Sequence, residues 1–362
     1  MDVSAFATSL ISFTVALGAL VFVHELGHFL VAKRVGVRVQ RFSIGFGPVI
    51  FSWRRGETEY AISAIPMGGY VKMLGEDDED EAGVAAEPER AFSTQPVWKR
   101  AAIVGAGPLM NFVFAFLVYA ALFGTIGVEL PSDLPKVGGV SAGMPAEQSG
   151  LKPGDLVVTI DGTPVATWTE LSDIVQASKG RTLNVVVERD GAQIPLQVTP
   201  ALHGGKSMFG EETESVYRIG IEASHELSKV SPVEALGTAA QQTWTASYVV
   251  LKGLGLMIQG RVPLSELGGP IAIARAAGQQ AQEGASRFLS MLAFLSVNLG
   301  VLNLLPIPAL DGGHLAFFGI EGLMRRPLRQ RHREIAQQVG VLLLITLMVF
   351  VFYNDIHRLV QG

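Results

Sequence analysis

The sequence predicts a polytopic α-helical membrane protein with four transmembrane helices, a membrane-associated β-hairpin region and an extracytoplasmic α+β domain. Its 362 residues are 49% hydrophobic and only 17% charged, whereas soluble domains carry about 25% charged residues. A segment with the pattern of short strands separates the second and third apolar stretches. Four stretches lack charge and have about the length that a transmembrane helix needs, and they cover residues 3–23, 101–128, 288–310 and 335–353.

Charge and cysteine content narrow the classes of function. The net charge is −5, which gives no support to nucleic-acid binding, since domains that bind nucleic acids carry a basic patch or stripe. The chain has no cysteine, so it forms neither disulfides nor thiolate metal sites. Any metal ion must therefore be held by His, Asp or Glu side chains.

The first apolar stretch is expected to stay in the mature protein. A secretory signal peptide begins with basic residues and has a short apolar core. Residues 1–4 carry no basic side chain, and the apolar run is longer than such a core.

Basic residues in short loops indicate the orientation, because loops rich in Lys and Arg stay in the cytoplasm. Two loops are basic, and the N-terminus is not. We therefore expect both termini and the α+β domain outside the cytoplasm. The basic residues are Lys33, Arg34, Arg38, Arg41, Arg54, Arg55, Lys72, Arg90, Lys99 and Arg100 in the first loop, and Arg325, Arg326, Arg329, Arg331 and Arg333 in the second.

The segment after the first stretch has the pattern of β-hairpins. Residues 37–73 alternate in part between apolar and polar side chains and are interrupted by Gly45, Gly47 and Gly56, which is typical of strands and turns. Residues 76–81 are almost wholly acidic, and we expect a solvated loop there.

The segment 131–223 is expected to form a soluble domain of short strands. Its order of Gly-Leu, Pro-Gly-Asp and Asp-Gly motifs resembles a PDZ domain, which implies binding of extended peptides at a sheet edge. The peptide-binding loop stays open, because Gly138 and Gly139 are equally well explained as strand residues. The expected elements are strands at 156–160 and 183–189, a helix near 169–178, and a turn at 190–191.

The motif His24-Glu25-Leu26-Gly27-His28 carries the strongest chemical signal. On a helix, positions i and i+4 lie on one face, so both imidazoles can reach one metal ion, with Glu25 beside them to act on a water molecule. Ionisable residues at the end of an apolar run usually face a functional interior. The alternative is that the span ends at Val23 and leaves the histidines at the membrane surface.

A third ligand is expected, because catalytic zinc usually has three protein ligands and one open position. Asp311 lies at the cytoplasmic end of the third stretch, at the same expected depth as the two histidines; His314 and Glu321 are its rivals. Pro306 and Pro308 interrupt the helix, and non-helical backbone at membrane depth is tolerated where it lines a cavity. Asn303 either packs between helices or holds the substrate backbone.

Together these motifs resemble the site-2 protease family of intramembrane metalloproteases, and more narrowly its bacterial regulator-of-sigma-E protease branch. The resemblance covers nearly the whole chain. Some members of this branch carry two tandem PDZ domains, whereas this chain has room for one. The matching segments are 24–28, 45–48, 67–73 and 303–312, together with the single PDZ-like region.

The resemblance implies one zinc ion per chain, held by His24, His28 and Asp311, with Glu25 as the base. It implies an enzyme of the bacterial inner membrane that cuts transmembrane segments of single-pass proteins after another protease has trimmed them. Anti-sigma factors and remnant signal peptides are the implied substrates. The hairpin would contact the substrate, so Gly68 and Gly69 join Asn303 as candidate substrate-binding residues.

Two other classes of function remain open from the residues alone. One is a membrane-anchored PDZ scaffold without catalysis, and the other is a metal or ion transporter with a His, Glu and Asp site in the membrane. The expected domains are 1–36 with the first span, 37–99 with the hairpin and acidic loop, 100–128 with the second span, 129–223 as the PDZ domain, 224–284 as an amphipathic linker, 285–324 with the third span, and 325–362 with the basic loop and fourth span.

Overall fold

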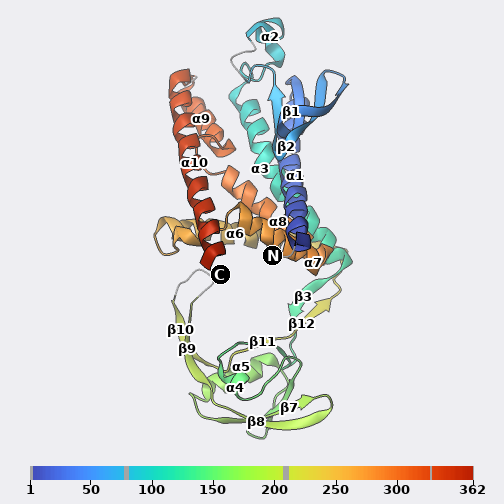
Figure 1. Cartoon of the computed structure of the whole chain (residues 1–362), viewed down its shortest axis with the longest axis vertical. Coiled ribbons are helices and arrows are strands. Elements are labelled where there is room, and N and C mark those ends of the chain that lie inside the picture. Colours follow the sequence, from blue (N-terminus) through green and yellow to red (C-terminus); the bar gives the residue numbers. More distant parts are fainter. Residues whose placement is uncertain (1–2, 77–80, 207–211, 327, 362) are drawn as a thin grey trace. The chain divides into compact units, whose positions relative to one another are not determined.

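The computed structural model describes residues 3–76, 81–206, 212–326 and 328–361, and it divides into two compact units. A helical unit comprises Met1–Leu122 and Leu236–Gly362, and a strand-rich unit comprises Phe123–Ala235 (Figure 1). The central part of the predicted acidic loop, residues 77–80, lies outside the described residues.

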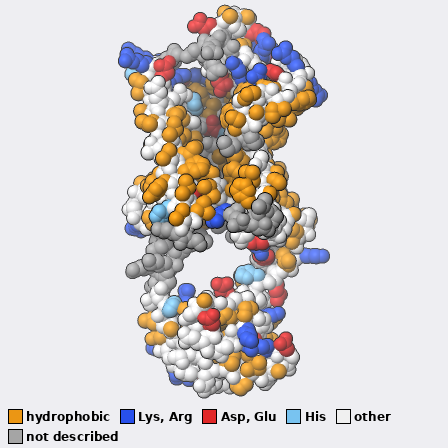
Figure 2. Space-filling model, viewed as in Figure 1, with side chains coloured by type: hydrophobic (Ala, Val, Ile, Leu, Met, Phe, Trp, Pro, Cys, Tyr) orange, Lys and Arg blue, Asp and Glu red, His pale blue; other side chains and the backbone are white. Residues whose placement is uncertain are grey.

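Four helices of the described chain are long and apolar enough to cross a membrane, and each contains most of one predicted stretch. The first continues well beyond Val23, to Arg34, and His24 and His28 lie inside this continuous helix. Apolar side chains cover much of the visible helical surface in Figure 2. The helices are α1 (Val3–Arg34), α3 (Val97–Thr125), α8 (Ala285–Asn303) and α10 (Gln330–Gln361).

The third predicted stretch is not one continuous helix. The helix α8 ends at Asn303, and a separate helix α9 (Asp311–Met324) begins after the intervening residues 304–310. Pro306 and Pro308 lie in the intervening segment, and proline lacks the N–H that helix continuation needs. Two further helices, α6 (Pro232–Ile258) and α7 (Pro270–Glu283), precede α8, where the sequence predicts one amphipathic region.

The predicted hairpin region is a single long hairpin that folds over on itself. The strands are β1 (Val39–Arg55) and β2 (Thr58–Met73). Residues 41–44 of β1 pair with 59–62 on one side and with 69–72 on the other. The base packs on α1 and α3 through a buried apolar cluster that includes Val39, Val71 and Ile103. Short helices α2 (Glu81–Ala86) and η2 (Pro88–Arg90) follow.

The strand-rich unit is built around a four-stranded sheet of order β6-β5-β7-β8. Strand β5 and the Asp190-Gly191 turn between β7 and β8 coincide with their predicted positions. Both turn residues have positive φ angles, as a tight hairpin turn requires. The elements are β3 (Val128–Pro131), β4 (Val137–Val140), α4 (Pro145–Gln148), β5 (Leu156–Ile160), β6 (Thr163–Pro164), α5 (Trp168–Ala177), β7 (Leu183–Arg189), β8 (Ala192–Val198), β9 (Ala201–Lys206), β10 (Glu212–Arg218), β11 (Ile221–Ala223) and β12 (His225–Ser228).

A buried ion pair ties two strands of this unit together. The Asp155 carboxylate is fully buried and accepts hydrogen bonds from Arg189 Nε at 2.6 Å and Nη2 at 2.7 Å. It also accepts one from the Lys152 backbone N–H at 2.9 Å. The pair therefore anchors the Pro-Gly-Asp turn to β7.

Replacing Asp155 with alanine should destabilise the strand-rich unit by about 3 kcal/mol, because the substitution leaves the partly buried Arg189 without its partner. Hydrogen exchange of the β5 and β7 amides in the full-length protein measures the loss. Asp173→Ala is the matched control, since Asp173 is exposed on α5. Exchange rates equal to those of the parent would contradict a stabilising role for the pair.

Candidate active site

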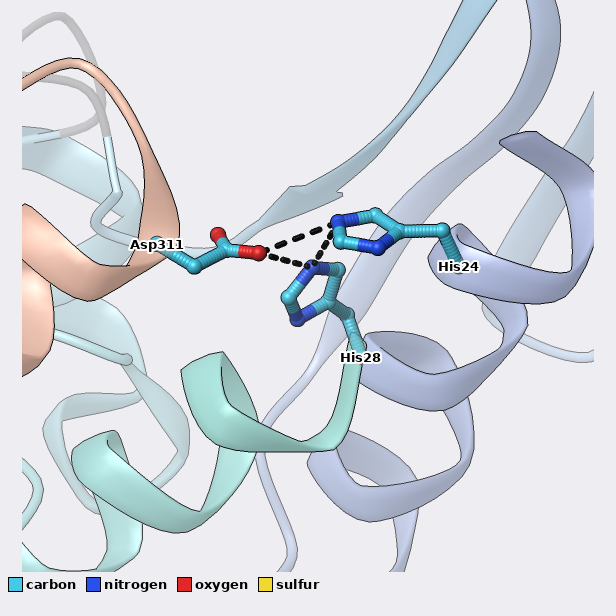
Figure 3. A group of neighbouring side chains, drawn as sticks. All are labelled: His24, His28 and Asp311. Carbon is cyan, nitrogen blue, oxygen red and sulfur yellow. Dashed lines mark hydrogen bonds and ion pairs between the residues drawn. The ribbon is translucent and has the colours of Figure 1, made fainter. Parts of the chain in front are cut away.

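Three potential metal ligands converge in the helical unit. His24 and His28 project from one face of α1, and Asp311 projects from the first turn of α9 (Figure 3). Asp311 Oδ2 lies 3.0 Å from His24 Nε2 and 3.6 Å from His28 Nε2, and the two Nε2 atoms are 3.2 Å apart. No other group of three potential ligands converges in this way within the part of the chain that the structure describes.

The broken third span brings Asp311 to the histidines. After α8 ends, the chain turns through residues 304–310, and α9 begins against this turn. A Cβ at Gly312 would lie 2.2 Å from the Leu305 carbonyl oxygen, and one at Gly313 would lie 2.5 Å from that of Ile307. Because only glycine allows this approach, the Asp-Gly-Gly sequence places the carboxylate at the start of a helix pressed against the turn.

The donor set fits zinc. His28 Nδ1 donates a hydrogen bond to the Ile103 carbonyl oxygen at 2.9 Å, which leaves the lone pair on Nε2, the atom that faces Asp311. Asp311 Oδ2 is buried, and apart from the two imidazoles that face it no described group hydrogen-bonds to it. Two imidazole nitrogens and one carboxylate oxygen form the type of ligand set that catalytic zinc sites use.

Helix α3 leaves space for the two imidazoles. A Cβ at Gly107 would lie 2.3 Å from His28 Nε2 and 2.9 Å from His24 Cε1. Any larger residue at this position would therefore displace both rings. In the sequence, Gly107 is marked only as a glycine in the middle of an apolar span, which helix propensity does not favour.

Glu25 lies beside these three converging side chains, on the wall of the same cavity. The cavity measures about 620 Å³ and is lined by His24, His28, Asp311 and the end of β2. The Glu25 carboxylate accepts a hydrogen bond from the Val71 backbone, and a Cβ at Gly69 would lie 3.3 Å from Glu25 Cγ. The hairpin therefore packs directly against the predicted catalytic carboxylate.

The rival ligands have other surroundings. Glu321 is buried, and its carboxylate pairs with Arg100 at 3.0 Å and with Arg333. His314 lines the cavity one turn after Asp311, but it is not part of the converging group.

The predicted substrate-binding residues lie at different places. Gly69 lines the cavity. Gly68 has a φ of +125°, and a Cβ there would meet the Phe46 ring at 2.0 Å, so packing within the hairpin explains this glycine. Asn303 is the last residue of α8 and is not among the described residues that line the cavity.

The strand-rich unit contains a separate groove. It measures about 480 Å³ and lies between α5 and residues 216–222, with Leu171, Val175 and Ile219 among its lining residues. Gly138 and Gly139 belong to strand β4, which pairs with β11, so they are strand residues and do not line this groove.

Comparisons with known proteins show the family to which the chain is similar. Residues 12–347 match the model of peptidase family M50. A Mesorhizobium japonicum protein that carries the name of a zinc metalloprotease is 39% identical, and the match covers 97% of this chain and 99% of that protein. The regulator of sigma-E protease RseP of Salmonella typhimurium is 33% identical, with coverage of 97% and 99%.

Solved structures similar to this chain cover only a small part of it. The PDZ domain of an SdrC-like protein from Listeria monocytogenes aligns with 26% of this chain and 93% of its own, at 22% identity and a TM-score of 0.20. A score this low supports no conclusion, so the description of the strand-rich unit rests on its own strands and helices.

Gly107→Ala should weaken zinc binding, because the added methyl group would overlap His28 Nε2. We expect a loss of affinity of roughly tenfold or more, in line with other changes beside metal ligands, measured by competition with a chelator. Gly105→Ala is the matched control on the same helix, since its Cβ would meet nothing closer than 3.9 Å. Equal affinities of the two variants would show that the imidazoles do not need this space.

Proposed function

The chain belongs to peptidase family M50 and is an intramembrane zinc protease, and on this basis we propose that His24, His28 and Asp311 hold its zinc ion and that Glu25 is its general base. The observation that carries the proposal is the convergence of Nε2 of both histidines and Oδ2 of Asp311 beside Glu25. A scaffold without catalysis would not need this converging group of side chains. A transporter would not need the edge of a β-hairpin beside its ion-binding residues.

The chemistry divides between the ion and the protein. Zinc supplies Lewis-acid polarisation of the scissile carbonyl and of the attacking water. Glu25 takes the proton from this water and later passes a proton to the leaving amine. The hydrogen bond from the Val71 backbone orients the carboxylate for both transfers.

We propose that the substrate is held as an added β-strand. A helix in the membrane satisfies its own backbone groups, so a substrate must unwind before hydrolysis. Residues 69–72 of β2 pair with β1 on one side, and Gly69, Tyr70 and Val71 line the cavity on the other. The N–H groups of Val71 and Met73 are directed to Glu25 and to Glu76 Oε2. Since strand residues alternate, the N–H of Gly69 faces the same way, toward an incoming strand.

The proposed substrates are single-pass membrane proteins such as anti-sigma factors or remnant signal peptides, cut after a first cleavage by another protease. The name of the Salmonella relative, regulator of sigma-E protease, supports this class. Asn303, the last residue of α8, is a further candidate for contact with the substrate backbone.

The proposed location is the bacterial inner membrane, with both termini and the PDZ-like unit outside the cytoplasm and the active site toward the cytoplasmic side. Figure 2 supports this orientation within the helical unit, because Lys and Arg side chains gather at the end that carries the hairpin and α2. Where β1 bends between residues 44 and 51, Ile50 is 71% and Phe51 57% exposed. Exposed apolar side chains of this size favour contact with the lipid bilayer.

Glu25→Gln should retain about one zinc ion per chain and lose cleavage by a factor of about 10² to 10⁴, because the amide cannot accept the proton. The assay uses detergent-purified protein and a single-pass substrate without its outer domain, with zinc measured on the same samples. A chelator should stop the wild type, and added zinc should restore it. Glu334→Gln, at another carboxylate of the cavity wall, is the control. Cleavage by Glu25→Gln at the wild-type rate would rule out this role.

Gly69→Pro should cleave the same substrate roughly three- to tenfold more slowly than Gly69→Ala, which corresponds to one hydrogen bond. Both variants add a Cβ near the Ser43 carbonyl oxygen, but only proline removes the N–H. Both should keep their zinc. Equal rates in the two variants would mean that the substrate does not pair with this edge.

A further inference from the structure

One face of α3 is turned toward the two imidazoles. It carries Ile103, Gly107 and Asn111, which are spaced one turn apart. The Ile103 carbonyl accepts the hydrogen bond of His28, and Gly107 provides the space for both rings. The amide of Asn111 lies beside His24, with 3.0 Å between its Nδ2 position and His24 Nδ1. Helix carbonyls point toward the C-terminus, and side chains lean toward the N-terminus. The Ile103 carbonyl and the Asn111 side chain therefore approach each other from either side of Gly107, where they contact His28 and His24.

We propose that Asn111 and Ser296 are positioning residues for the metal centre. They form a buried hydrogen-bond relay that keeps the proton of His24 on Nδ1 and so presents the lone pair of Nε2 to zinc. The proposal rests on the ligand set proposed above, in which His24 binds through Nε2.

The relay is buried and crosses three helices. Asn111 on α3 and Ser296 on α8 are both fully buried, and His24 on α1 is 8% exposed. Ser296 Oγ lies 2.9 Å from the Asn111 backbone oxygen and 3.4 Å from the Asn111 Oδ1 position. Polar groups this deep among apolar helices need partners, and these three residues partner one another.

Counting hydrogens, together with the proposed ligand set, sets the direction of the relay. A serine hydroxyl has one hydrogen, so Ser296 donates to only one of the two oxygens of Asn111. Half a turn of the Asn111 amide exchanges Oδ1 and Nδ2 in nearly the same space, and the hydrogen-bond network decides between the two orientations.

Only the turned amide gives both the oxygen and the nitrogen of the Asn111 side chain a partner and also leaves the lone pair of His24 Nε2 for zinc. Ser296 Oγ–H then donates to the Asn111 backbone oxygen, Asn111 Nδ2 donates to Ser296 Oγ, and Asn111 Oδ1 accepts from His24 Nδ1–H. A neutral imidazole carries one N–H, so a proton on Nδ1 leaves the lone pair on Nε2, 3.0 Å from Asp311 Oδ2. His24 and His28 thus reach the same tautomer through different partners, a side-chain amide and a backbone carbonyl.

A simpler role for Asn111 is to join α1, α3 and α8 by hydrogen bonds. The two roles differ in what they control. A purely joining residue controls stability, whereas the relay controls zinc affinity and does so through an acceptor oxygen opposite Nδ1.

The test measures zinc affinity by chelator competition in the full-length protein carrying Glu25→Gln, so that turnover does not enter. Asn111→Leu has similar size and no acceptor, and it should bind zinc roughly 10- to 100-fold more weakly. Asn111→Asp keeps an oxygen opposite Nδ1 and should stay within a few-fold of the parent. Ser296→Ala should weaken binding several-fold, because the amide loses the partner that orients it. Asn298→Leu, a half-buried asparagine of α8, is the matched control.

Zinc affinity of Asn111→Leu within twofold of the parent would overturn the proposal, and so would an Asn111→Asp variant as weak as Asn111→Leu. If Asn111→Leu does not fold, Ser296→Ala decides, since unchanged affinity there would also overturn the relay. His24→Ala distinguishes a failure of the proposed ligand set from a failure of the relay. If it keeps parental affinity, the ligand set is wrong; if it loses zinc while Asn111→Leu does not, only the relay is wrong.

Discussion

The close approach of α1 and α3 is the constraint on which the rest of the site depends. A Cβ at Gly27 would lie 2.2 Å from the Ala106 carbonyl oxygen, and one at Gly107 would overlap His28. Small residues let helices pack closely where lipid offers no hydrophobic drive for association. With the two backbones this close, α3 provides both the space for the imidazoles and the groups that hold their outer nitrogens.

The site also requires a carboxylate at the same depth as the two histidines. A continuous third span would present Asp311 somewhere along a regular helix. The break at residues 304–310 instead lets α9 begin beside the two histidines, and the cavity there contains polar groups that a membrane interior would otherwise exclude. The folded hairpin closes this cavity from another side, so Glu25, the ligands and a strand edge share one enclosure.

Much of this could be predicted from the sequence, because the relevant signals are local. The spacing of His24 and His28 follows from helical geometry, and charge-free stretches define the four long helices. Asp311 was inferred from its expected depth together with the prolines before it. Turn chemistry at Asp190 and Gly191 located the hairpin between β7 and β8.

The contacts between helices could not be predicted in the same way. A helix that is apolar on all sides gives no indication of which face meets a neighbour, so the role of Gly107 and the pairing of Asn111 with His24 depend on rotations that hydropathy does not record. The fold-over of the hairpin depends on pairing of 41–44 with two segments at once, which alternation alone does not reveal. The start of α9 depends on backbone contacts at Gly312 and Gly313.

The central claim is that two histidines and one aspartate of this chain bind the zinc ion. X-ray absorption at the zinc edge of the purified protein tests it most directly. The account predicts a four-coordinate ion with only nitrogen and oxygen ligands at about 2.0–2.1 Å and the outer-shell scattering of two imidazoles, reduced to one in His28→Ala. A spectrum with three imidazoles, or one that His28→Ala leaves unchanged, would contradict it.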